Sequence, residues 1–149
     1  MIKDSGQRTE FPSGAVRDIQ EGKGRFDLLP LKEVSEYIED DPTLYSIGRF
    51  QETGNVDFLY IAIDSSKFFA TKMDAIIEVA IHFEEGAKKY GENNWQKGIP
   101  VNRYIDSAVR HYFKHRRGDT DERHDRAFVW NLLCAVWEVK NHGETGEIN

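Results

Sequence analysis

The sequence predicts an all-α protein, a single-domain helical bundle built around one buried helix near its C-terminal end. Residues 121–140 place apolar side chains around nearly the whole circumference of a helix drawn at 100° per residue. Such a helix belongs in the centre of a packed domain. Its one polar line is His124, Asn131 and Glu138, spaced i, i+7, i+14. Buried polar groups need partners, so either another helix or a ligand is expected along this line.

Composition narrows the function classes. The chain has 149 residues, enough for one domain with a real core. Its net charge of −6 argues against general nucleic-acid binding. The lone cysteine, Cys134, lies in the apolar helix and fits a reducing interior. Neither a signal peptide nor an 18-residue apolar run is visible, so no membrane contact is expected and the cytoplasm is the expected location.

The first 25 residues are rich in glycine, serine and charge, and we expect them to be only partly ordered. Within them Gly22 and Gly24 bracket Lys23, with Arg25 next. A flexible backbone with two cations could clasp a phosphate, or it could be a plain solvated loop. It is not a Walker loop, because the glycine spacing is wrong and no strand is apparent. The all-α domain is expected over residues 26–141, with a polar tail over 142–149.

Three short helices are predicted between residues 30 and 66. Pro30 opens the first, and residues 41–42 break it. Thr43 can cap the second, which stops at Gly54. The third begins at residue 55; residues 58–63 also permit a strand, but no partner strand is visible.

A long helix is predicted over residues 72–90, between a capping box at Thr71 and a stop at Gly91. Its apolar face is Ile76, Val79, Ala80, Phe83, Ala87 and Tyr90, extended by Ile77 and Ile81. Its polar line is Glu78, His82, Glu85 and Lys89. That line could ligate a metal, or it could simply face water.

The loop over residues 91–102 holds Trp95, which is either pinned into the core or placed for a flat ligand. The next helix, residues 102–116, has a core face and a polar face, and the polar face is Asp106, Ser107, Arg110, His111 and Lys114. Gly118 stops it, and Asp119 with Glu122 caps the central helix.

Carboxylates and imidazoles thus come from three helices, together with a supply of lysine and arginine. Acidic groups that converge inside a bundle repel unless cations lie between them. Oxygen and imidazole ligands suit Mg²⁺, Mn²⁺ or Co²⁺. A metal with lysine and arginine is what a triphosphate requires, because its hydrolysis builds negative charge on phosphoryl oxygens.

Four strings resemble the phage-associated dATP/dGTP diphosphohydrolase family: GKGRFDLLP (22–30), GAKKYGENNW (86–95), the pair Arg110-His111, and DERHDRAFVWN (121–131). The resemblance covers residues 13–30 and about 74–140, and residues 31–70 look like an addition. It implies cleavage of purine deoxynucleoside triphosphates to the monophosphate and pyrophosphate, in host cytoplasm if a phage encodes the chain. A looser similarity is to all-α MazG-type pyrophosphohydrolases, which bind Mg²⁺ through EExxE and a later ExxD. Glu122-x-x-Asp125 fits the second element, whereas Glu84-Glu85 is followed by lysines and breaks the first.

These inferences assign the site residues as follows. The predicted metal ligands are Glu78, Glu85, Glu122 and Asp125, and the catalytic candidates are Glu78, His111 and His124. The substrate-binding candidates are Lys23, Arg25, Lys89, Asn94, Trp95, Arg110, Lys114 and Asn131. The expected cofactor is a divalent metal, Mg²⁺ first, and the expected assembly is a homo-oligomer. The alternatives are a protein that sequesters a nucleotide without turnover and a structural helical interaction protein.

Overall fold

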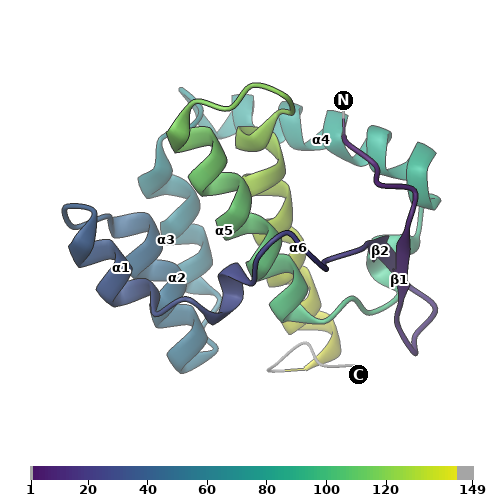
Figure 1. Cartoon of the computed structure of the whole chain (residues 1–149), viewed down its shortest axis with the longest axis horizontal. Helices are drawn as coiled ribbons and strands as arrows, with labels where there is room; N and C mark the ends of the chain where they lie inside the picture. Colours follow the sequence, from purple (N-terminus) through teal and green to yellow (C-terminus); the bar gives the residue numbers. More distant parts are fainter. Residues whose placement is uncertain (1, 144–149) are drawn as a thin grey trace.

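Helices α5 (Val101–Arg117) and α6 (His124–His142) form the centre of the molecule. The computed structural model describes residues 2–143. Helix α6 packs against α5, α4 and α3, and its residues Phe128, Leu132 and Ala135 are completely buried. The predicted buried C-terminal helix and the all-α class are confirmed (Figure 1).

The remaining elements flank this pair. On one side lie α1 (Leu31–Tyr37), α2 (Pro42–Thr53) and α3 (Asp57–Ser66), and on the other α4 (Lys72–Tyr90) and the hairpin of β1 (Arg8–Glu10) and β2 (Val16–Asp18). Single 3-10 turns, η1 (Phe26–Leu28) and η2 (Asn94–Gln96), precede α1 and α5. The predicted tail, residues 142–149, lies outside the described residues from 144 onward.

Helix ends follow local chemistry, with differences from the sequence prediction at α2 and α6. Helix α6 begins at His124 after Arg123 without a side-chain cap, so the expected cap by Asp119 with Glu122 is wrong. The Thr71 side chain accepts a hydrogen bond from the Asp74 N–H at 3.0 Å, and Gly54 closes α2 with φ of 72°. The cap of α2, however, is Asp41 rather than Thr43, because Asp41 accepts from the Leu44 N–H at 3.0 Å and Pro42 occupies the first turn.

The orientation of α4 confirms part of the predicted apolar face, because Val79 is buried and Phe83 packs against the core, and contradicts the rest. The polar line faces inward: His82 is buried, and Glu78 and Glu85 are half-buried against α6. The aliphatic face points outward, with Met73, Ile76, Ile77 and Ile81 all exposed. The expectation that Ile76, Ile77 and Ile81 cover the core is therefore wrong, and so is the reading of the polar line as a water-facing stripe.

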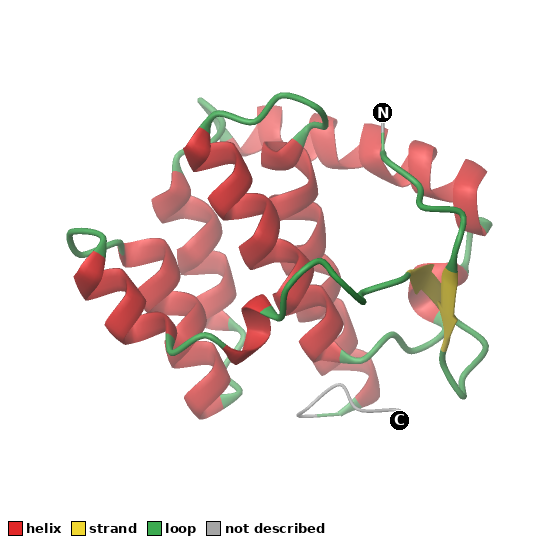
Figure 2. Cartoon of the chain, viewed as in Figure 1, coloured by secondary structure: helices red, strands yellow, loops and turns green. Residues whose placement is uncertain are grey.

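The N-terminal segment forms a hairpin, where the sequence suggested no strand (Figure 2). The strands pair antiparallel, with Thr9 opposite Arg17. The segment is held from outside, because Ala15 is completely buried and Asn94 bonds the backbone of Val16. These anchors carry Arg17 and Asp18 toward the helices.

The structure bears on the cysteine and on membrane-spanning helices. Cys134 is buried and free, as predicted for a small core residue. Among the described residues, no helix is long and apolar enough to cross a membrane.

Candidate functional site

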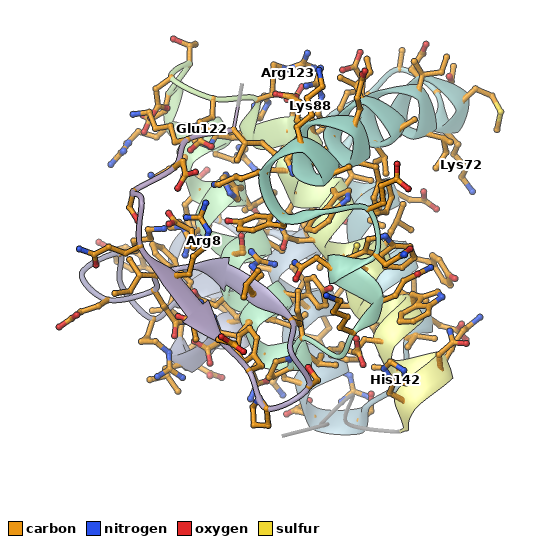
Figure 3. All side chains as sticks on the ribbon, turned by 90° about the vertical axis from the view of Figure 1, so that its right-hand side faces the viewer. Arg8, Lys72, Lys88, Glu122, Arg123 and His142 are labelled. Carbon is orange, nitrogen blue, oxygen red and sulfur yellow. The ribbon has the colours of Figure 1, made fainter. Side chains whose placement is uncertain are left out.

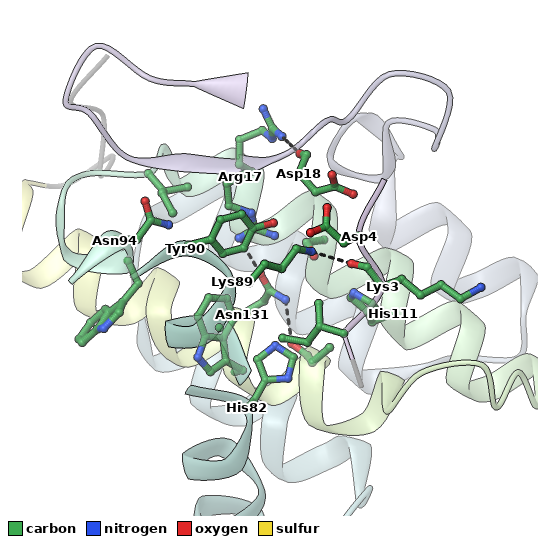
Figure 4. Close-up of a pocket in the computed structure, with 18 of the residues that line it drawn as sticks. Lys3, Asp4, Arg17, Asp18, His82, Lys89, Tyr90, Asn94, His111 and Asn131 are labelled. Carbon is green, nitrogen blue, oxygen red and sulfur yellow. Dashed lines mark hydrogen bonds between the residues drawn. The ribbon is translucent and has the colours of Figure 1, made fainter. Parts of the chain in front are cut away.

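A cavity of about 420 Å³ lies between α4, α5 and α6, and the N-terminal segment covers it. Figure 4 shows Lys3 and Asp4 from that segment opposite His82 of α4 and His111 of α5. The Lys89 ammonium donates to the backbone oxygen of Lys3 at 2.6 Å, which ties the segment to α4. The cavity therefore has walls from regions far apart in the sequence.

Cations outnumber carboxylates in the lining. Seven cationic side chains line the cavity: Lys3, Arg17, Lys23, Lys89, Arg103, Arg110 and Lys114. Five carboxylates line it: Asp4, Asp18, Glu92, Asp106 and Glu122. Because like charges that are crowded together repel one another without a counter-charge, the cavity suits an anionic ligand.

The arginines of α5 show this crowding most clearly. Burial, followed by the charge of Arg17, lowers the pKa of Arg103 to about 10. Arg103 donates to the backbone oxygen of Asp18 at 3.1 Å. Burial also lowers the pKa of Arg110, although the Asp106 carboxylate at 3.0 Å opposes the shift. An anion in the cavity would stabilise both charges.

Asp106 organises the approach of the N-terminal segment. Asp106 is only 2% exposed, and it pairs with Arg110 at 3.0 Å. Its carboxylate accepts from the Phe26 N–H at 2.6 Å and from the Gln20 side chain at 2.8 Å. Segment 20–26 is thereby fixed against α5.

Of the two cations in the glycine-rich loop, only one reaches the cavity. Lys23 lines the cavity and pairs with Asp18 at 2.8 Å. Arg25 instead makes two bonds of 2.9 Å to Asp27, is largely exposed, and is not part of the cavity lining. The predicted phosphate clasp by two cations is therefore reduced to Lys23.

The predicted base-binding residues have structural partners. Trp95 packs between Phe83 and Trp137, with ring centroids 5.1 and 4.9 Å away, so it is pinned into the core at the cavity wall. Both amide atoms of Asn94 bond the Val16 backbone at 2.7 Å. The amide group of Asn94 therefore holds β2 in place, which leaves it poorly suited to reading a base.

Asn131 and Trp130 form the floor contributed by α6. Asn131 donates to the Ala127 carbonyl at 2.8 Å and accepts from Arg17 at 3.2 Å. Among the described residues, the indole N–H of Trp130 has no hydrogen-bond partner. The His82 ring lies 5.0 Å from Trp130.

His82 of α4 and His111 of α5 line the cavity and are held neutral. Burial is the main cause that lowers the pKa of His82 to about 4, with Arg126 and Arg17 adding to it against Glu85. Burial and then Arg110 lower the pKa of His111 well below its usual value. Nδ1 of His111 lies 2.8 Å from Nδ1 of His124, and Nε2 of His124 lies 2.7 Å from Asp121. One ligand atom each of His111, Glu122 and His124 lie within 4.8 Å of one another.

The α4 carboxylates lie elsewhere. Glu78 accepts from Arg126 at 2.6 and 3.1 Å, and Glu85 accepts from Arg126 at 2.8 Å. Asp125 pairs with Arg123 at 3.0 Å. Figure 3 shows Glu122 beside the N-terminal segment, whereas Arg123 lies next to α4.

The structure thus separates the predicted ligands into two sets. Among the described residues, two groups of three side chains place potential metal-ligand atoms within 4.8 Å of one another. These groups do not include Glu78, Glu85 or Asp125. Glu122 joins the two histidines instead. A metal role for Glu78, Glu85 and Asp125 stays a prediction, against which their guanidinium partners count.

Of the predicted residues, the cavity brings together Lys23, Lys89, Asn94, Trp95, Arg110, His111, Lys114, Glu122 and Asn131. Sequence reasoning missed Arg103, Arg17 and Lys3. Arg103 was within reach, because it precedes Arg110 by seven residues and so shares its helix face. Arg17 carried no such signal, since its hairpin was not foreseen.

Fold and cavity define a helical protein with a cation-lined pocket for a small anionic ligand. A family model described as dATP/dGTP diphosphohydrolase, N-terminal, matches residues 51–147, and the chain belongs to that family. The match contains the strings at 86–95 and 121–131 but not the one at 22–30, and it begins inside the block that looked like an addition. No curated protein and no solved structure matches the chain.

Proposed function

We propose that the protein hydrolyses purine deoxynucleoside triphosphates, dGTP or dATP, to the monophosphate and pyrophosphate in this cavity. The observation that carries the proposal is the cationic surplus of a 420 Å³ cavity that also has aromatic walls. The family name describes the same class of hydrolase. A triphosphate would supply the negative charge that the lining lacks.

Cations of α4 and α5 would bind the triphosphate during this reaction. Lys89, Arg103 and Lys114 come from two facing helices and would hold phosphoryl oxygens between them. A water oxygen attacks the α-phosphorus, the bond from that phosphorus to the bridging oxygen breaks, and pyrophosphate leaves. Fixed cations stabilise the charge that builds up on these oxygens.

The attacking water must lose a proton. Without a bound metal His111 is placed to take it, whereas a metal held by His111 and Glu122 would instead lower the pKa of that water. The His111 ring lines the cavity, and its lowered pKa keeps it neutral near pH 7. A neutral imidazole can accept a proton, whereas a charged one cannot. Glu122 lines the same end of the cavity and is the second candidate base.

The purine has a flat wall to lie on. The rings of Tyr90, Trp95 and Trp130 all line the cavity. Stacking of a base on an aromatic ring is tolerant of base identity.

Metal dependence is part of the proposal. The sequence suggested Mg²⁺ first, but the donors that lie together include two imidazoles, so Mn²⁺ or Co²⁺ is now the proposed ion. A bound dication would polarise phosphoryl oxygens and lower the pKa of a bound water. The donor set that fits is His111, Glu122 and His124, since these ligand atoms are close together and two of the residues face the cavity. The carboxylates of Glu78, Glu85 and Asp125 fit less well because arginines engage them.

The test is direct. The purified chain is incubated with each of the four deoxynucleoside triphosphates and Mg²⁺ or Mn²⁺, and the products are separated by ion-exchange chromatography. We expect purine monophosphate and pyrophosphate in equal amounts, and no orthophosphate. Saturable binding by calorimetry without any turnover would contradict the enzyme and support a nucleotide-sequestering protein. If the chain neither binds nor hydrolyses any of the four nucleotides, the structural interaction protein is the alternative that is supported.

A homo-oligomer is also proposed. Met73, Ile76, Ile77 and Ile81 form a continuous exposed aliphatic face on α4. A second copy could bury it. Sedimentation velocity should show a species larger than the monomer, and Ile77→Glu should dissociate it; a monomer at all concentrations would contradict this.

A further inference from the structure

We infer that His111, Glu122 and His124 form a site for a transition-metal dication, with Asp121 as the residue that orients His124. The inference rests on the proposed function only for the use of the metal, and not for its binding. It names a site whose ligands prefer Mn²⁺, Fe²⁺, Co²⁺ or Zn²⁺ to Mg²⁺.

The distances between ligand atoms suit one ion. Imidazole nitrogens bind such metals at about 2.1 Å, so two of them in neighbouring coordination positions lie about 3 Å apart. Nδ1 of His111 and Nδ1 of His124 are 2.8 Å apart. The nearest Glu122 oxygen completes a triangle with no side above 4.8 Å.

The hydrogen bond between Nε2 of His124 and Asp121 sets the tautomer of His124. Nε2 of His124 lies 2.7 Å from a carboxylate oxygen of Asp121, which can only accept. Nε2 therefore carries the proton, and the lone pair of Nδ1 points toward His111. Metal-binding histidines characteristically donate their other N–H to a carboxylate in this way.

His111 can serve in two forms. Without metal, its Nδ1–H donates to Nδ1 of His124, which satisfies both buried rings. With metal, the proton of His111 sits on Nε2 and both Nδ1 lone pairs face the ion. The exchange requires only a change of tautomer in a neutral ring, so no charge has to be buried.

The ligand types select the metal. Two imidazoles and one carboxylate suit first-row transition metals, whereas Mg²⁺ prefers oxygen ligands throughout. His111 and Glu122 both line the cavity, so the remaining coordination positions open toward the proposed substrate. Open positions of this kind distinguish catalytic from structural metal sites.

A neighbouring group of potential ligands is a weaker candidate. Asp119, Asp121 and His124 also place ligand atoms within 4.8 Å of one another. Arg117 already makes two bonds to Asp119, and Lys3 pairs with Asp121 at 2.9 Å. Asp119 therefore provides a matched control, because it is close by and has the same charge as Glu122.

The experiment titrates the metal-stripped, full-length chain with Co²⁺ in the absence of nucleotide. Binding is followed by visible d–d absorption and by calorimetry. We expect one equivalent of Co²⁺ to bind and millimolar Mg²⁺ not to displace it. Glu122→Gln and Asp121→Asn should each weaken Co²⁺ binding by about tenfold to a hundredfold, whereas Asp119→Asn should leave it unchanged.

Circular dichroism of each variant checks that the fold is intact. Glu122 is only half-buried and accepts a hydrogen bond from the backbone N–H of Lys3 at 3.0 Å, so Glu122→Gln should fold even if a His111→Gln variant does not. No binding at millimolar Co²⁺, or equal binding by wild type and Glu122→Gln, would overturn the site. Loss of binding in Asp119→Asn alone would move it to the neighbouring group. Co²⁺ binding without any hydrolysis would keep this site and refute the proposed function.

Discussion

The α4–α6 contact and the cavity beside it both bury charge, but they balance it differently. In the contact, Arg126 is 9% exposed and bonds two carboxylates, Glu78 and Glu85, so the protein supplies both signs. In the cavity, Arg103 and Arg110 are crowded by Arg17, and the carboxylates are too few. The first arrangement holds two helices together. The second stores unbalanced positive charge that a ligand can neutralise.

A charged helical stripe therefore does not identify a site by itself. Both regions derive from similar polar lines, on α4 and on α5. What separates them is whether a partner element brings the opposite charge. Binding sites are therefore expected where the protein leaves the balance incomplete, at a cost in stability that the ligand offsets.

The largest expected effect is the loss of the compensated charge in the contact. Arg126→Met removes the cation shared by two half-buried carboxylates and should lower the free energy of unfolding by about 3 kcal/mol. Urea denaturation measures it. Arg123→Met is the control, because Arg123 is 45% exposed and should cost less than about 1 kcal/mol. Equal losses in the two variants would contradict the distinction.

The fall of the free energy of unfolding at acid pH tests the neutral state of His82, which lies next to the α4–α6 contact. The pKa of His82 is about 4 in the folded chain, below the value of about 6.5 expected when unfolded. Between these values the unfolded chain binds more protons, so stability is complete above pH 6.5 and falls as the pH is lowered. His82 should account for about 2 kcal/mol of loss by pH 4.5.

In a His82→Leu variant the free energy of unfolding should depend less steeply on pH below 6.5, when unfolding is measured at several pH values. An unchanged slope would show that His82 does not titrate as the structure requires. Inorganic pyrophosphate offers a sharper readout, since an anion in the cavity should raise the pKa of His82 in an NMR titration. The unliganded chain provides the reference.

The cavity should respond in the opposite sense to the contact. Arg103→Met removes a surplus buried cation, so the free energy of unfolding should stay within about 1 kcal/mol of wild type. Nucleotide binding should nevertheless weaken by about tenfold or more, because a charge-assisted bond to phosphate is lost. Calorimetry measures both affinities. Arg25→Met, whose partner is Asp27 outside the cavity, should bind nucleotide like wild type.

The smallest effect concerns Asn94. Asn94→Ala removes two bonds to the Val16 backbone and should cost about 1 kcal/mol of stability. The relative rates with purine and pyrimidine nucleotides should not change. A changed base preference would show that Asn94 contacts the base after all.

Local chemistry alone determined much of the fold. Helical periodicity, the Thr71 cap and the glycines after α2 and α5 placed helix ends to within a few residues. These signals act between neighbours in the chain, which a sequence displays. The apolar circumference of α6 likewise required burial whatever surrounded it. The strings at 86–95 and 121–131 pointed to the family that the comparison shows.

Tertiary structure decided which face of α4 turns inward. Periodicity predicted that Ile76 and Ile77 would be buried, but Arg126 of α6 offers Glu78 and Glu85 a partner, so these carboxylates turn inward and the two isoleucines are exposed. It also decided that Glu122, rather than these carboxylates, lies with His111 and His124. A sequence lists which charges exist, whereas their pairing depends on distances between elements that only the packed chain defines.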